Sequence, residues 1–321
     1  MRKPFNHLRF IKNLIKFSPR QLEGETKAAR FLISLLDRHR ISHSEQRFFV
    51  KIPRVKKAIL EADGVSVKCD GVSMVSGETK NGKYKITKSL VSPDHNVSGN
   101  NFYINYNPKC PVISNNNNYF SPAVSIAPKD LYKIRGSKYV RGQVQVEAIK
   151  HKAINILIGN TKNPKIICLA HYDSIKKGAI DNASGIAVIM GAILFSPEIL
   201  KYTMFVLSGG SELSYEDPLY YGYGYRIFEK RNYKKMDKAE KIIAIDCVGY
   251  GETEIIKNKK RVELASPLVN VKKWCNKITI ITGRLDKLMT VYHSDIDDGR
   301  YLKEKYLGKD RNLLIDQLNI D

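Results

Sequence analysis

The segment 165–185, KIICLAHYDSIKKGAIDNASG, constrains the fold of this chain more than any other part of the sequence. It begins with the continuous apolar run IICLA, which is typical of a strand buried on both faces of a parallel sheet. His171 and Asp173 follow this run at once, and Asp181 comes just before an apolar segment, Ala183 to Phe195, that should form a buried helix. Because open α/β sheets bind ligands at the carboxyl ends of their strands, the segment predicts a polar site at that edge.

Strand and helix patterns alternate along the rest of the chain beyond His151. The predicted strands are Ala153 to Ile158, Lys165 to Ala170, Tyr202 to Leu207, Ile242 to Val248 and Lys277 to Ile281. Alternation of this kind predicts an α/β fold with a mainly parallel central sheet flanked by helices. We therefore assign residues 147–321 to the larger part of one catalytic domain.

Residues 1–54 are predicted to form the N-terminal part of the same domain. Leu8, Ile11 and Ile15 recur at helical spacing, and the segment from Ser18 to Gln21 has the pattern of a capped helix start. The segment from Ser44 to Ile52 is predicted to form a strand that ends at Pro53.

Residues 55–146 differ from both flanks and predict an inserted small β subdomain. Their short β-like segments are separated by turn formers, and the pair Asn81-Gly82 is a strong hairpin signal. The sequence leaves two interpretations equally open. The insertion either overhangs the site and selects substrates, as loops grafted on a scaffold often do, or is a solvated subdomain without a catalytic role.

The charge of the chain limits its partners. It has 54 Lys and Arg residues against 32 Asp and Glu residues, which gives a formal net charge of +22. The basic residues are spread along the chain and match no nucleic-acid-binding motif, so we expect nonspecific polyanion binding but no specific nucleic-acid partner. No apolar run approaches the ~20 residues that a membrane-spanning helix needs, so no membrane span is expected.

The five cysteines are scattered and include no CxxC pair, which argues against a disulfide framework and against a thiolate zinc site. Cys168 and Cys247 lie in segments predicted as apolar strands, where they are expected to be small core residues. We infer a reducing, cytoplasmic setting.

The motifs HYDS, from His171, and GAIDNASG, up to Gly185, together resemble the two-zinc aminopeptidases of metallopeptidase family twenty-eight, of the leucyl aminopeptidase and aminopeptidase Y type. The resemblance implies a zinc aminopeptidase-like fold. It also implies a metal-dependent hydrolase that removes N-terminal residues from peptides with a free N-terminus, by attack of metal-bound hydroxide. The segment from Ser121 to Ile134, SPAVSIAPKDLYKI, further suggests that the insertion is similar to the protease-associated insertion of some relatives.

The resemblance also implies five metal ligands, each after or near the end of a predicted strand: His171, Asp181, Glu212, Asp246 and His293. In the family pattern, Asp181 bridges two metal ions. His171 and Asp246 complete one site, Glu212 and His293 complete the other, and Asp173 orients His171. Imidazole and carboxylate ligands without cysteine favour zinc, and also suit cobalt or manganese.

The chain departs from the family pattern at Ser211. Relatives place two glutamates together here, the first as general base and the second as metal ligand, whereas this chain has Ser211 followed by Glu212. A serine hydroxyl cannot accept a proton near neutral pH, so the base is either lost or supplied by another residue such as Glu216 or Asp217. The alternative function is therefore a catalytically weak or inactive homologue that acts as a binding protein. A glutaminyl-cyclase-like acyltransferase is a third, weaker interpretation.

Overall fold

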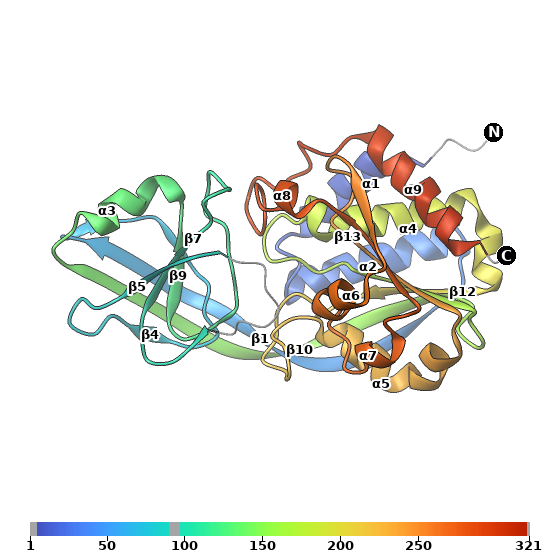
Figure 1. Cartoon of the computed structure of the whole chain (residues 1–321), viewed down its shortest axis with the longest axis horizontal. Helices are drawn as coiled ribbons and strands as arrows, with labels where there is room; N and C mark the ends of the chain where they lie inside the picture. Colours follow the sequence, from blue (N-terminus) through green and yellow to red (C-terminus); the bar gives the residue numbers. More distant parts are fainter. Residues whose placement is uncertain (1–4, 90–96, 320–321) are drawn as a thin grey trace.

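The structure is a computed structural model that describes residues 5–89 and 97–319. The segments 1–4, 90–96 and 320–321, which fall within the three predicted domain ranges, lie outside it. Figure 1 shows a larger lobe that carries both chain ends, and a smaller lobe joined to it by two long strands, β1 and β10.

A nine-stranded mixed sheet forms the centre of the larger lobe, with the order β14-β15-β13-β11-β12-β10-β1-β2 and with β4 paired to β10. Four adjacent strands are parallel: β12 (Thr203–Ser208), β11 (Ile166–His171), β13 (Lys241–Asp246) and β15 (Ile278–Gly283). The antiparallel strands around them are β14 (Thr253–Ile256), β10 (Val140–Gly159), β1 (His43–Ala62), β2 (Val65–Ser66) and β4 (Gly77–Glu78). The predicted α/β fold with a central sheet flanked by helices is confirmed. The sheet is mixed rather than mainly parallel, because β10, β1, β2, β4 and β14 add antiparallel pairings around the four parallel strands.

Helices cover both faces of this sheet. Successive side chains of each parallel strand point to opposite sides, so both faces carry apolar side chains that helices bury. In β11, Cys168 packs in a core with one group of helices and Leu169 in a second core with the other group. The first group is α1 (His7–Leu14), α2 (Glu23–Arg38), α4 (Ser184–Phe195) and α9 (Glu304–Leu318); the second is α5 (Tyr223–Lys238), α6 (Lys259–Ala265) and α7 (Val271–Trp274). Helix α4 is buried along most of its length, as its uniformly apolar sequence predicts. Among the described residues, no helix has the length and apolarity needed to cross a bilayer.

Two expectations for the N-terminal part are wrong. The helix predicted to begin at Ser18 begins at Glu23 instead, because Arg20 is fully buried and its guanidinium donates to the carbonyl groups of Lys177 and Gly178. The strand predicted to end at Pro53 continues as β1 to Ala62. At Pro53, β1 pairs with β10 on one side only, which is the edge-like position where prolines occur in sheets.

The smaller lobe has a sheet and a hydrophobic core of its own. Its strands are β3 (Cys69–Gly71), β9 (Ala123–Ile126), β7 (Tyr103–Tyr106) and β5 (Lys85–Lys88), with β6 (Val97–Ser98) and β8 (Tyr119–Phe120) paired separately, and α3 (Leu131–Arg135) lies beside them. The predicted Asn81-Gly82 turn is confirmed, since both residues have positive φ and the Lys83 N–H donates to the Lys80 carbonyl.

The predicted boundaries of the insertion, at residues 54/55 and 146/147, fall within β1 and β10. These strands remain paired from one lobe into the other, with a register shift between Val55 and Lys57 near the first boundary. The far halves of both strands contribute Leu60, Val140 and Val144 to the core of the smaller lobe. The two lobes are therefore connected by a continuous antiparallel ribbon.

Candidate metal centre

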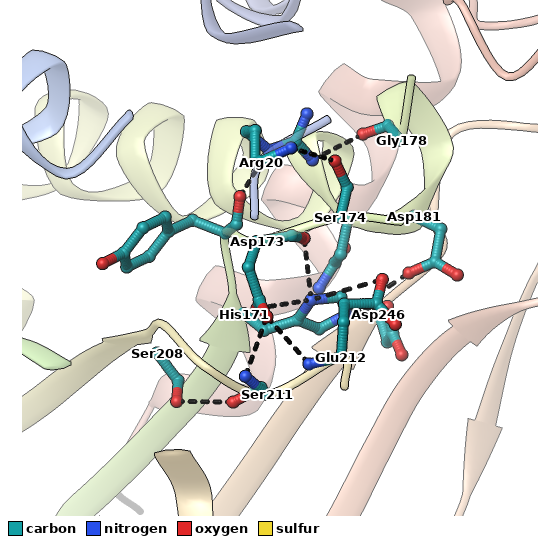
Figure 2. A network of polar contacts seen from close by, with 12 residues as sticks. Arg20, His171, Asp173, Ser174, Gly178, Asp181, Ser208, Ser211, Glu212 and Asp246 are labelled. Carbon is teal, nitrogen blue, oxygen red and sulfur yellow. Dashed lines mark hydrogen bonds and ion pairs between the residues drawn. The ribbon is translucent and has the colours of Figure 1, made fainter. Parts of the chain in front are cut away.

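The five predicted ligands converge at the carboxyl edge of the parallel strands. His171 and Asp246 are the last residues of β11 and β13, and Glu212 lies in the loop after β12. Asp181 belongs to the π-helical turn Ala179–Ala183 before α4, and His293 follows α8 (Leu285–Leu288). Figure 2 shows four of these side chains directed toward one another. They form two groups with ligand atoms within 4.8 Å of one another: His171, Asp181 and Asp246, and Asp181, Glu212 and His293.

Asp181 belongs to both groups because its two oxygens face opposite ways. Its Oδ1 lies 3.3 Å from Nε2 of His171, and its Oδ2 lies 3.4 Å from Nε2 of His293. Each imidazole has one further carboxylate beside it. Asp246 Oδ1 lies 3.4 Å from Nε2 of His171, and Glu212 Oε2 lies 3.4 Å from Nε2 of His293. The arrangement is that of two ligand sets sharing one carboxylate.

The motif around Asp181 has a structural explanation. The Asn182 side chain donates to the Ile245 carbonyl of β13 at 2.9 Å and accepts from the Cys247 and Gly185 N–H groups at 3.2 and 3.0 Å. It thus ties the start of α4 to the strand that carries Asp246. Position 185 must be glycine, because a Cβ atom there would overlap the Asn182 amide.

Asp297 fixes the turn that carries Asp181. Its carboxylate accepts from the Ile180 N–H at 2.7 Å and from the Asp181 N–H at 3.2 Å, and its carbonyl accepts from the Ala179 N–H at 2.9 Å. Burial raises the pKa of Asp297 to about 8. The sequence alone predicted no role for Asp297.

Arg20 holds the loop between the first two ligands and was missed as a site residue. Its guanidinium donates to the carbonyls of Tyr172 and Lys177 and to that of Gly178, which Figure 2 shows. The Arg20 carbonyl accepts from the Ser174 N–H. Burial lowers the pKa of Arg20 to about 10, which leaves it charged at neutral pH. No local sequence pattern predicts this role of Arg20, because its hydrogen-bond partners lie about 150 residues away in the chain.

Asp173 contacts His171, as the resemblance implies, but its carboxylate has a second task. The Nδ1 atom of His171 lies 3.2 Å from the Asp173 carbonyl and 3.5 Å from Oδ1 of its carboxylate. The other carboxylate oxygen, Oδ2, accepts from the N–H groups of Ser211 and Glu212, both at 2.8 Å. Asp173 therefore positions one ligand directly and a second through the backbone of the loop after β12.

His293 is oriented by the smaller lobe. Its Nδ1 atom lies 2.9 Å from the carbonyl of Asn115, and the Asn115 N–H donates to the His293 carbonyl at 3.0 Å. Ser114 donates to the Tyr292 carbonyl at 2.6 Å, and Asn107 donates to Ser114 at 3.1 Å and to the Met289 carbonyl at 2.9 Å. A proton on Nδ1 leaves Nε2 as the acceptor atom that faces Asp181 and Glu212. These contacts favour the interpretation in which the inserted lobe takes part in the site.

The buried carboxylates of the cluster need positive charge beside them. Burial alone would lower the pKa of His293, but Glu212 and Asp181 beside it raise that pKa to about 10. Burial, together with Asp181, raises the pKa of Glu212 to about 7. Although burial opposes it, the two imidazoles hold the pKa of Asp181 below its usual range. The carboxylates are thus costly to bury without cations next to them.

Divalent metal ions fit this set of residues. Among the described residues, no Lys or Arg side chain forms an ion pair with the three carboxylates of the cluster, whose ion-pair partners are the two imidazoles. The Oε1 atom of Glu212 is buried and has no hydrogen-bond partner. Mixed imidazole and carboxylate ligands at hydrogen-bonded, buried positions are the chemistry that zinc prefers.

Ser211 does not face the cluster with its hydroxyl. Its Oγ lies 2.8 Å from Oγ of Ser208 (Figure 2). The Ser208 hydroxyl in turn donates to Asn155 at 2.9 Å. Neither Glu216 nor Asp217 lines the cavity beside the ligands. Glu216 instead accepts from the Lys51 N–H at 3.2 Å, so the two substitute bases suggested by the sequence lie outside the site.

All five cysteines are free, and Cys247 lies outside the strand in which it was predicted. Cys168 is buried inside β11, as predicted. Cys247 lies just after the end of β13, with φ of 55°, and its thiol donates to Asp246 Oδ1 at 3.2 Å. Burial raises the pKa of the Cys247 thiol well above its usual value, which keeps it protonated and unreactive.

We predict that Ser114→Ala weakens metal binding, because it removes a hydrogen bond that holds the backbone next to His293. Loss of such an outer contact typically lowers metal affinity about 10- to 100-fold. Zinc affinity measured by competition with a chelator checks this.

Ser125→Ala is the matched control, since Ser125 is also fully buried in the smaller lobe but bonds to Asn105 within that lobe. Equal zinc affinities for the two variants would contradict the role of the lobe.

Comparisons with known proteins agree with this geometry. The model of peptidase family M28 matches residues 154–295, a range that contains all five predicted ligands. No curated protein matches the chain significantly.

Solved structures show the fold over nearly the whole chain. A zinc aminopeptidase from Bacillus subtilis has a TM-score of 0.67 at 16% identity, covering 97% of this chain and 94% of its own. A peptidase M28 precursor from Shewanella amazonensis has a TM-score of 0.68 at 14% identity, covering 97% and 92%. A glutaminyl cyclase from Tannerella forsythia has a TM-score of 0.54 at 13% identity, covering 99% and 100%. These structures share one fold with the chain, and residues 154–295 are similar to peptidase family M28.

Proposed function

We propose that the chain is a metal-dependent hydrolase of the aminopeptidase type, which removes N-terminal residues from peptides and holds two divalent metal ions, preferably zinc. One observation carries the proposal. The two oxygens of Asp181 face two separate pairs of one imidazole and one carboxylate. His171 and Asp246 would hold one ion, Glu212 and His293 the other, and Asp181 both.

The bound ions would activate water and polarise the carbonyl of the scissile amide. The residues of the chain bind and orient the substrate beside them. Asp181, Glu212 and His293 are nearly inaccessible to solvent, whereas the Asp246 side chain is 44% exposed toward the cavity. The substrate would therefore approach from the Asp246 side, where Tyr225 and Tyr292 also line the cavity.

The base that takes a proton from the nucleophilic water is missing from its family position. The only cavity-lining carboxylates of the described chain outside the ligand set are Glu254 and Asp286, and each pairs with an arginine. We infer slow turnover, because a positioned base contributes about 10²- to 10⁴-fold. The same observation favours the second candidate, an inactive homologue that binds peptides.

Three further expectations remain proposals. The small lobe, assigned to residues 55–146, is proposed as an insertion of the protease-associated kind. The setting is proposed to be reducing and cytoplasmic, in keeping with five free cysteines. Polyanion binding is proposed to be nonspecific, from the net charge of +22.

The proposed function is tested by metal analysis together with peptidase assays. The purified protein should contain two equivalents of zinc and should release the first residue of unblocked peptides, but not of N-acetylated ones. A chelator should abolish this activity. Peptides that begin with glutamine should lose that residue; conversion to a cyclised N-terminus would show the cyclase reaction instead.

Asp181→Ala should lower the metal content most, because it leaves both ligand sets incomplete. We expect loss of bound zinc and of activity in a protein that still folds. Asp298→Ala is the control, since that carboxylate lies at the surface and pairs with Arg300. A folded Asp181→Ala protein with unchanged metal stoichiometry would refute the bridging assignment.

Ser211→Glu should raise turnover about 10²-fold, the lower end of what a positioned base contributes. The new side chain must turn into the cavity, because Ser208 and Gly224 fill the space behind Ser211. Ser211→Gln has nearly the same shape without a base and should give no increase. If neither the natural protein nor Ser211→Glu shows turnover, the non-catalytic alternative holds.

A further inference from the structure

The smaller lobe ends, on the side farthest from the larger lobe, in three chain segments that contact one another. Figure 1 shows α3 at this end, beside the ends of β1 and β10 that pair at Ala62 and Val140. The segments are residues 63–66, 80–85 and 128–139, and we call them together the distal end. None of their residues lines the cavity beside the metal ligands.

Hydrogen bonds and packing join the three segments. The carboxylate of Asp63 accepts from the Tyr139 N–H at 2.8 Å, and the Tyr84 hydroxyl donates to the carbonyl of Ile134 in α3 at 3.0 Å. The ring of Tyr139 lies against Gly82 of the hairpin, where a Cβ atom would come within 2.9 Å of the ring. The side chains that the distal end presents to solvent are therefore held in place by the fold.

Three large apolar or aromatic side chains of the distal end are exposed. Tyr132 is 70%, Val65 64% and Tyr139 53% exposed, and Tyr132 is the most exposed large hydrophobic residue of the described chain. Val65 belongs to the turn after β1 and Tyr132 to α3, so the fold assembles this group from segments that are distant in the sequence. Single exposed apolar side chains are ordinary, but a group of them at one end of a molecule is typical of an interaction surface.

Positive charge surrounds these three side chains. The distal end contains seven Lys and Arg residues against two Asp residues. One of the two aspartates, Asp130, pairs with Lys133 at 2.7 Å, and the other, Asp63, accepts from backbone N–H groups. The other six basic side chains are exposed and form no ion pair within residues 5–89 and 97–319: Lys80, Lys83, Lys85, Lys129, Arg135 and Lys138.

This combination of groups fits a lipid surface better than another polyanion. Tyrosine rings are suited to the interface between water and lipid, because one end of the ring is apolar and the other is polar. Lys and Arg side chains next to them can reach anionic headgroups while their aliphatic stems stay against apolar surface. A nucleic acid would use the positive charge and could stack on a tyrosine, but it would leave Val65 exposed to water.

We propose that the distal end docks the chain on an anionic membrane surface. Val65, Tyr132 and Tyr139 enter the headgroup region, and the six unpaired basic side chains face anionic headgroups. The attachment is peripheral, because only side chains of short segments enter the lipid. It leaves the cavity beside the metal ligands uncovered, since no residue of the distal end lines that cavity.

The first test measures binding of the full chain to vesicles by sedimentation. Vesicles of phosphatidylcholine alone are compared with vesicles that also contain phosphatidylserine. Each basic residue near an anionic surface contributes about fivefold to binding, so the chain should bind the anionic vesicles on the order of 10²-fold more tightly. High salt should weaken this binding. Equal binding to both kinds of vesicle, or binding to neither, would overturn the proposal.

The second test separates the distal end from the net charge of the whole chain. The triple variant Lys80→Gln, Lys83→Gln, Lys138→Gln should lose about 10²-fold in affinity for the anionic vesicles. The control is Lys230→Gln, Lys234→Gln, Lys305→Gln, which removes the same charge from three exposed lysines of the larger lobe that also form no ion pair within the described chain. The control should keep its affinity within a few-fold. Equal losses in the two variants would show attraction by net charge alone and contradict the docking surface.

The third test asks whether the exposed rings enter the lipid. Tyr139→Trp should show a blue shift and strong quenching by brominated lipids, whereas the natural Trp274, buried in the larger lobe, should show neither. Should Tyr139→Trp fail to fold, Tyr132→Trp replaces it, because that side chain is the more exposed one. A folded variant that binds anionic vesicles without quenching would refute insertion.

The fourth test separates lipid from nucleic acid. Single-stranded polyuridine is titrated into the natural chain and into the triple lysine variant. Weak RNA binding that both proteins share is what the net charge alone gives, and it agrees with a membrane partner. RNA binding that is lost in the triple variant, together with vesicle binding that is not, would assign the distal end to nucleic acid and overturn the proposal.

Discussion

Three carboxylates and two imidazoles share one buried edge of the central sheet, and the rest of the larger lobe depends on this constraint. Groups of this kind are costly to bury unless positive charge lies among them, and the described chain supplies no Lys or Arg to pair with the carboxylates. Divalent ions satisfy both requirements. Asp181 is the residue shared by both ligand sets, because each of its oxygens faces a different imidazole.

The surrounding structure holds these side chains against their mutual repulsion. Asn182 ties the start of α4 to β13, Asp297 fixes the turn of Asp181, and Arg20 anchors the loop after β11. The smaller lobe completes the set through Asn115, which orients His293. The inserted lobe is therefore part of the support of the site, and its loss would remove the partner of one ligand.

The ligands were predictable from the sequence because each follows an apolar strand or lies in a recognisable motif, and a parallel sheet brings strand ends together. The residues that hold the ligands in place were not predictable in this way. Arg20, Ser114 and Asn107 act on partners more than 150 residues away, so no local pattern announces them. The sequence even suggested a helix start at Ser18, because a capping pattern is local while the burial of Arg20 is decided by the loop it meets.

The central claim is that one carboxylate joins two metal sites, and anomalous X-ray diffraction from zinc-loaded crystals tests it most directly. Data collected above and below the zinc absorption edge locate each ion without reference to activity. The account predicts two peaks, one against His171 and Asp246 and one against Glu212 and His293, with Asp181 touching both. A single peak, or two peaks of which either lies out of contact with Asp181, would contradict it.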